Sequence, residues 1–253
     1  MNFQHKFYAA FALTLVFECP GRVLAGCDVA ETMSLAQSIS SEASAFTEKT
    51  VRENQAKNEA HDTSELRACY QVDTKRLKRL VECANDRPDK RKPELATFFD
   101  LTVAQAYLAT AVNFHWCHLG AEINAVLWES VVSRDPGNEK ALAALRATKQ
   151  FDKDAEEAAN RYVRRMKVLV QPLAARNNGD AMRLMGVLLT QPELAGPDAD
   201  ANLAADYLYR AGLQFLKAGE REKAIIMIGV IEGIDQNQPL ARRLREEVYG
   251  KAP

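Results

Sequence analysis

The chain has 253 residues, 47% of them hydrophobic, so it is long enough to bury a sizeable core as one domain, or as one domain with an appendage. Its 33 basic and 34 acidic residues leave a net charge of −1, which argues against a global electrostatic attraction to nucleic acid or to an anionic membrane. Only 12 glycines and 9 prolines are present, a composition that favours helices and leaves few residues for tight hairpin turns.

Residues 1–25 have the pattern of a secretory signal. A weakly basic start precedes an apolar run from Phe7 to Phe17, which is too short to span about 30 Å of hydrocarbon. Small or aliphatic residues follow at positions 23–25, so we predict cleavage after Ala25 and export to the periplasm. As an alternative, residues 24–27 resemble a lipobox, in which Cys27 would carry a lipid and tether the protein to a membrane.

Four cysteines remain after cleavage, and an even number in an oxidising compartment permits two disulfides. We predict that residues 28–60 and 62–85 form an antiparallel helix pair, which places Cys27 near Cys83. A turn around residues 88–93 would likewise bring Cys117 back toward Cys69. Cys69 and Cys83 would lie about 21 Å apart on one helix, beyond disulfide reach. The favoured pairs are therefore Cys27–Cys83 and Cys69–Cys117, and lipidation of Cys27 would leave an odd thiol.

A charged loop bounded by two prolines, residues 87–93, is the best domain boundary in the chain. It separates a helical hairpin at residues 26–92 from a region at residues 93–253. In this second region we expect Ala-rich amphipathic helices of ten to twenty residues. The expected turns between them contain Gly, Pro, Asn and Asp and lie at residues 135–138, 177–180, 196–198, 218–220 and 235–237. Because no run alternates as a strand would, the predicted fold class is all-α.

One stretch of this second region resembles a tetratricopeptide repeat. In residues 207–224 the small pair of that family appears as Ala211-Gly212, its aromatic as Phe215, its turn glycine as Gly219 and its second-helix alanine as Ala224. A weaker match ends at Asn138 and would place a turn at Gly120.

Residues 179–189 with 203–211 are similar to a Sel1-like repeat, so that residues 202–218 would serve both as the second helix of one unit and as the first of the next. The resemblance covers roughly residues 95–250 and implies a solenoid of antiparallel helix pairs, closed by a capping helix at residues 240–249. It also implies a concave surface that binds a protein or peptide. The residues expected to contact that partner are Arg183, Tyr209, Arg210 and Gln214.

His115, His118 and Glu122 form the best candidate for metal binding or catalysis. On a continuous helix their spacing of i, i+3 and i+7 would place them on one face. However, His115 continues an apolar stripe, and a turn at Gly120 would put Glu122 on another axis. We therefore favour structural histidines, and expect no metal and no cofactor.

No sequence motif of a nucleophile, a metalloprotease or a phosphate-binding loop is present, so we expect a non-catalytic protein. Basic clusters at residues 75–79, 90–92 and 161–167 are interpreted as solvated faces, with an acidic partner surface or a wall polymer as the functional option. Since no aromatics are interleaved with these charges, nucleic acid is not an expected partner.

The predicted function is that of an exported scaffold or adaptor that binds another protein in the bacterial envelope, with an accessory role in a secretion or envelope-assembly machine as one form of it. Two alternatives stay open. The first is an envelope enzyme or metal-binding protein that uses the His115/His118 region. The second is an immunity or inhibitor protein that binds one toxin. Contact with a membrane is expected only if Cys27 is lipidated.

Overall fold

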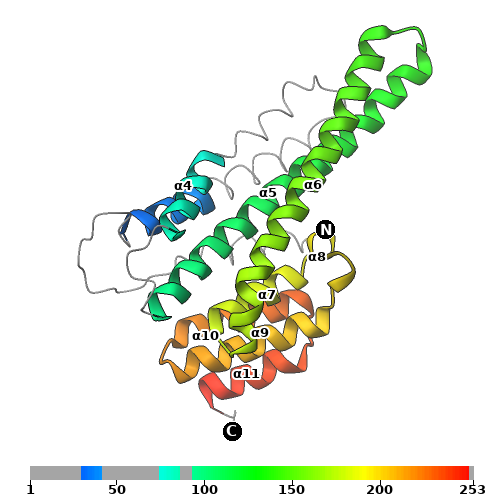
Figure 1. Ribbon diagram of the computed structural model, residues 1–253. Coiled ribbons are helices and arrows are strands. Elements are labelled where there is room, and N and C mark those ends of the chain that lie inside the picture. Colours follow the sequence, from blue (N-terminus) through cyan, green and yellow to red (C-terminus); the bar gives the residue numbers. More distant parts are fainter. Residues whose placement is uncertain (1–29, 42–73, 86–92, 251–253) are drawn as a thin grey trace.

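The computed structural model describes residues 30–41, 74–85 and 93–250, and these residues are helical apart from short turns (Figure 1). No strand occurs in these three ranges, so the all-α prediction is confirmed for them. Residues 30–41 form one helix. The other elements are α4 (Thr74–Asn85), α5 (Pro93–Arg134), α6 (Glu139–Ala175), α7 (Gly179–Leu189), α8 (Pro192–Ala195), the short 3-10 helix η2 (Gly196–Asp198), α9 (Ala201–Lys217), α10 (Arg221–Ile234) and α11 (Pro239–Tyr249).

The longest elements are α5 and α6, which pack against each other as an antiparallel hairpin. They contain 42 and 37 residues, or about 63 and 55 Å at 1.5 Å per residue. The prediction of helices of ten to twenty residues is therefore wrong for this part of the chain, and so is the turn at Gly120. A lone glycine costs a helix only about 1 kcal/mol, and with no proline or capping residue beside it the helix continues.

The turns predicted at residues 135–138, 218–220 and 235–237 lie between helices. The predicted turn at 177–180 runs into the first residues of α7, and residues 196–198 form η2 itself. Asn138 caps α6 by accepting a hydrogen bond from the backbone N–H of Ala141 at 3.0 Å. Asn178 caps α7 in the same way through Ala181, at 2.9 Å. Gly219 ends α9 with a φ of +78°, in the left-handed region that glycine adopts without strain. These caps satisfy N–H and C=O groups that a helix end would otherwise leave unpaired.

Helices α7 to α11 form a compact base (residues 179–249) at one end of the hairpin (Figure 1). Within the base, α9 packs against α7, α10 and α11. Two glycines allow close helix approach: an added Cβ at Gly186 would lie 2.6 Å from Cγ of Leu208, and one at Gly212 would lie 2.5 Å from Cδ2 of Leu244. Both leucines are fully buried.

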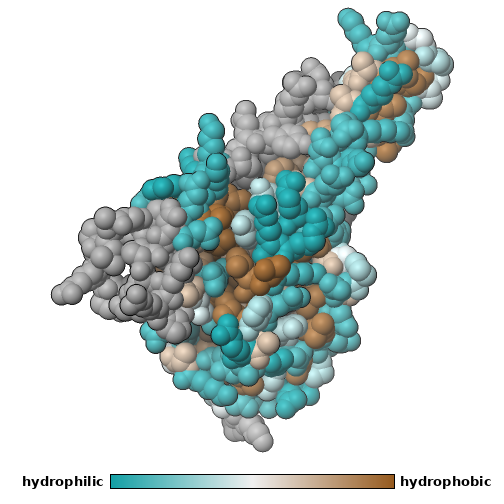
Figure 2. Space-filling model, in the orientation of Figure 1, coloured by the Kyte–Doolittle hydropathy of each residue, from teal (hydrophilic) through white to brown (hydrophobic). Residues whose placement is uncertain are grey.

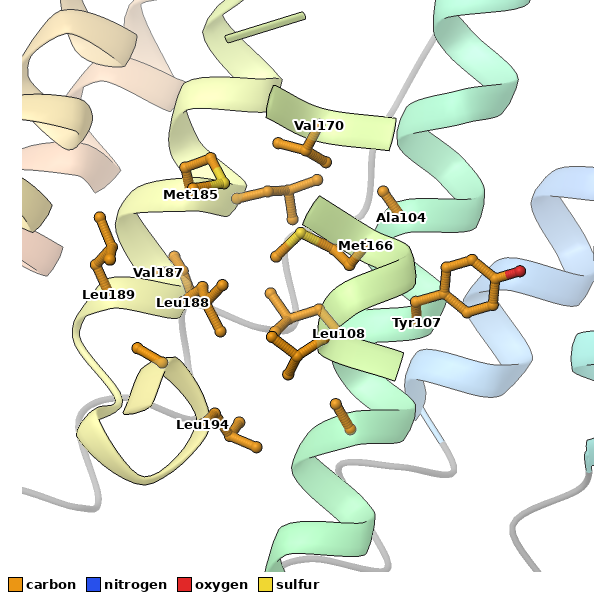
Figure 3. Close-up of a cluster of buried hydrophobic side chains, with 14 of the residues drawn as sticks. Ala104, Tyr107, Leu108, Met166, Val170, Met185, Val187, Leu188, Leu189 and Leu194 are labelled. Carbon is orange, nitrogen blue, oxygen red and sulfur yellow. The ribbon is translucent and has the colours of Figure 1, made fainter. Parts of the chain in front are cut away.

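One hydrophobic core joins the hairpin to the base. Figure 3 shows Leu108 of α5, Met166 of α6 and Leu188 of α7 pointing toward one another, and all three are fully buried. Leu194 of α8 closes the same cluster. The long hairpin is therefore anchored by its base-side half, while the turn at its far end points away from the base (Figure 1).

In the described part of the N-terminal region, α4 packs against α5 of the hairpin. The helix at residues 30–41 is joined to α4 by a hydrogen bond from Arg76 to Ser38 Oγ at 2.8 Å, and Arg79 lies 3.5 Å from Glu31. The predicted signal, the lipobox with Cys27, Cys69 and the boundary loop at residues 87–92 all lie outside the described residues.

Of the described helices, α5 alone is long and apolar enough to cross a membrane. In its most apolar 18-residue window, 67% is buried inside the protein, as in a core helix that packs on other helices.

Candidate functional site

The residues expected to contact a partner lie on α9 and α7, and the structure brings only some of them together. Arg210 donates a hydrogen bond to Asn177 Oδ1 at 2.9 Å, so it faces the turn between α6 and α7. Gln214, one turn later, lies beside Gly179 at the same turn. Tyr209 faces the other way, toward α11, where the guanidinium of Arg243 lies 5.6 Å from its ring centroid.

Arg210 and Gln214 belong to a half-exposed polar row on α9. Asp206, Arg210 and Gln214 are four residues apart and therefore share a side of the helix. Arg210 also lies 3.6 Å from the Asp206 carboxylate and 5.9 Å from the ring centroid of Tyr207. We call Asp206, Tyr207, Arg210 and Gln214 the α9 edge. Together these residues offer a guanidinium, a carboxylate, an amide and an aromatic ring.

Arg183 lies in a different environment, because it is only 8% exposed. Its Nε lies 3.5 Å from Oδ1 of Asp180, which is also 8% exposed. Lys223 of α10 lies 3.9 Å from the other oxygen of Asp180, and 2.8 Å from Glu220. Oδ1 of Asp180 accepts no hydrogen bond from the described residues. Arg183 therefore belongs to a buried charge cluster between α7 and α10, separate from the α9 edge.

The histidine candidates lie on one uninterrupted helix, since α5 continues through Gly120. The Nδ1 of His118 lies 2.6 Å from Oδ1 of Asp152 on α6, and its Nε2 lies 3.8 Å from Oε1 of Glu122. The rings of His115 and His118 are 6.1 Å apart between centroids. No group of three His, Cys, Asp or Glu side chains suited to a metal ion occurs in the part of the chain that the structure describes.

These contacts favour a structural role for both histidines. His118 ties α5 to α6 through a carboxylate that sequence inspection did not identify, because Asp152 lies 34 residues away. Burial lowers the pKa of His115 below its usual value of 6.5, His118 lowers it further, and Glu193 of α8 offsets part of the decrease. A neutral, half-buried His115 is suited to packing between α5 and α8.

Cys83 and Cys117 are both buried, with 3% and 0% of their surfaces exposed. Burial of this degree is compatible with a disulfide at each of them. Their predicted partners, Cys27 and Cys69, lie outside the described residues. The pairing of all four stays a prediction.

Comparison with known proteins finds no family model, no curated protein and no solved structure that matches this chain. The resemblance to tetratricopeptide and Sel1-like repeats therefore rests on the residues themselves.

Proposed function

We propose that this chain is an exported, non-catalytic scaffold that binds another protein in the bacterial envelope. The α9 edge carries this proposal. Its guanidinium and amide groups are of the kind that bind the backbone or the acidic side chains of a peptide, and Tyr207 adds a flat apolar surface. Because α9 is held by α7, α10 and α11, these groups are presented on a rigid support.

We further propose that α7, α9, α10 and α11 form a short series of stacked helix pairs. The same contact recurs in this series: a glycine of one helix receives a buried leucine of a later one, from Gly186 to Leu208 and from Gly212 to Leu244. In this arrangement α9 belongs to both neighbouring units, as the overlapping repeat resemblance requires. Repeated stacking of this kind produces an extended binding surface in helical-repeat proteins.

The proposed setting of this scaffold is the periplasm, where the disulfides Cys27–Cys83 and Cys69–Cys117 would fasten residues 26–92. An accessory role in a secretion or envelope-assembly machine is one form of this function.

Site-specific crosslinking in cells tests the proposal. A photo-reactive amino acid at Gln214 should give one or a few discrete protein adducts in the periplasmic or membrane fraction. The same amino acid at Glu246, which is exposed on a different helix, α11, should not give them. Adding Arg210→Glu should reduce the Gln214 adducts at least fivefold, whereas Arg242→Glu should leave them unchanged.

Equal adducts from both positions, or none from Gln214 in folded protein, would contradict the binding role of the α9 edge. A full-length, uncleaved product in the cytosol would contradict export. A single small, tightly bound partner would instead favour the inhibitor alternative.

A further inference from the structure

A second surface, on α6, carries a local excess of positive charge. Arg161, Arg164 and Arg165 are all exposed, and their spacing of three and four residues places them on one side of the helix. None of the three forms an ion pair with a carboxylate of the described residues. The lysines before and after them do, since Lys153 lies 4.0 Å from Glu157 and Lys167 lies 2.7 Å from Asp198. Three adjacent guanidinium groups therefore have no carboxylate within 4 Å in the described part of the chain.

Two buried tyrosines contact Arg161 and Arg165. The guanidinium of Arg161 lies 5.6 Å from the ring centroid of Tyr162, and that of Arg165 lies 5.9 Å from the same ring. Arg165 also lies 6.0 Å from the ring centroid of Tyr107 on α5. Phe114 stacks on Tyr162 at 5.9 Å, so that the tyrosine pair is supported from within the hairpin. Distances within about 6 Å permit cation–π attraction.

This support prepares the guanidinium groups for an anion. A guanidinium that lies over a ring uses its face for the aromatic contact and keeps its N–H donors for paired hydrogen bonds to a carboxylate. Because the rings already restrict Arg161 and Arg165, these two side chains lose less conformational entropy when a partner binds. The arginine cluster is thus better suited to carboxylate recognition than freely moving surface lysines would be.

The neighbouring surface favours a polypeptide partner. Val168 lies one turn beyond Arg164 and is 72% exposed, so one apolar side chain adjoins the three charges. Figure 2 shows hydrophilic side chains over α6 next to hydrophobic surface. A single exposed valine offers too little apolar area to enter a bilayer, and the tyrosine rings are only 7% exposed, so that they cannot stack on bases.

We propose that Arg161, Arg164, Arg165 and Val168, called here the α6 arginine face, bind an acidic segment of another protein. Carboxylates of that segment would pair with the guanidinium groups, and an apolar side chain would cover Val168. The positive charge of this face is a local excess, since the chain as a whole has a net charge of −1. The α6 arginine face is distinct from the α9 edge, so the loss of one proposal leaves the other standing.

Fluorescence anisotropy with a short labelled peptide of glutamate, leucine and alanine tests this proposal directly. The purified chain should bind the peptide, with affinity that falls as salt is raised. The triple variant R161Q/R164Q/R165Q should bind at least tenfold more weakly. The matched control K140Q/R146Q/R242Q removes the same charge from exposed positions elsewhere and should retain binding within about twofold. Circular dichroism confirms that each variant is folded.

Two further measurements test whether the planar guanidinium group matters and whether the partner is a polypeptide. The variant R161K/R164K/R165K keeps the charge but loses the planar fork, so its affinity should lie between wild type and the glutamine variant. Equal affinity of wild type and the glutamine variant, or an equal loss in the control, would overturn the proposal. So would tighter binding of anionic lipid vesicles or single-stranded DNA than of the glutamate peptide through the same three arginines.

Discussion

At the residue scale, the contact between Gly212 and Leu244 allows the least change in size. A Cβ at position 212 would lie 2.5 and 2.9 Å from the two methyl carbons of Leu244, which is fully buried and therefore cannot swing away. We predict that overpacking by Gly212→Ala costs about 1–3 kcal/mol of stability. The higher helix propensity of alanine returns about 1 kcal/mol of this cost. Urea unfolding measures the change.

Gly229 is the matched control, because a Cβ there meets nothing within 4 Å on the exposed side of α10. Gly229→Ala should stabilise the protein by about 1 kcal/mol. Introducing Gly212→Ala into a Leu244→Ala background should cost less than it does in the wild type, since the space is then available. Equal costs in the two backgrounds would show that Gly212 is not packed under Leu244.

His115 gives the molecule a predictable dependence on pH. Its pKa is lowered chiefly by burial, so the unfolded chain binds the His115 proton at a higher pH than the native protein does. As the pH falls below about 6.5, the unfolded state gains protons first and native stability decreases. We predict that the stability difference between wild type and His115→Gln is constant from pH 8 to about 7 and shifts in favour of the variant toward pH 5. A stability difference that shifts in favour of the wild type toward pH 5 would contradict a lowered pKa of His115 in the native protein.

At the element scale, the sequence predicts helix ends better than helix lengths. Turn and cap residues act on their immediate neighbours, so the turns that contain Asn138, Asn178 and Gly219 could be predicted from the local sequence. A helix through Gly120 could not be predicted in the same way. Whether a glycine interrupts a helix depends on what packs beside it, and α5 is held along its length by α6.

The candidate sites show the same division between local and long-range information. The four-residue spacing of Arg210 and Gln214 is enough to place them on one side of α9. Spacing along a helix could not show that Asp152 meets His118, that Arg165 lies over Tyr107 or that Arg183 is buried. Each of these facts depends on a second helix whose register only the folded hairpin or base fixes. The basic cluster at residues 161–167 was visible in sequence, but its tyrosine support was not.

At the scale of the whole molecule, stability is expected to be uneven. Among the described residues of α5 to α11, the large, fully buried apolar side chains lie where the hairpin meets the base or within the base, as with Leu108, Met166 and Leu188. Beyond the His118–Asp152 contact, residues 119–151 form the distal arm. Phe151, next to Asp152, is the one large apolar side chain buried in the described arm, and the other buried side chains are alanines, Asn124 and Thr148. Ile123 and Val126 are 47% and 64% exposed. Less apolar burial implies that the arm opens locally before the base unfolds.

Thr148 provides a test that separates arm from base. Its hydroxyl is buried and has no hydrogen-bond partner among the described residues, a condition that costs about 1–3 kcal/mol. We predict faster native-state amide exchange in residues 121–134 and 139–151 than in residues 162–174 and 182–189. Thr148→Val, which keeps the shape and removes the hydroxyl, should slow exchange in the arm about tenfold and leave exchange in the base unchanged.

Thr110→Val is the control, because the buried Thr110 hydroxyl donates a hydrogen bond to Ala106 O at 2.8 Å. Loss of this paired hydroxyl should not slow exchange in the arm or in the base. Uniform protection across arm and base would mean that the hairpin unfolds as one unit with the base. A gain from Thr110→Val as large as that from Thr148→Val would mean that the unpaired hydroxyl of Thr148 is not what destabilises the arm.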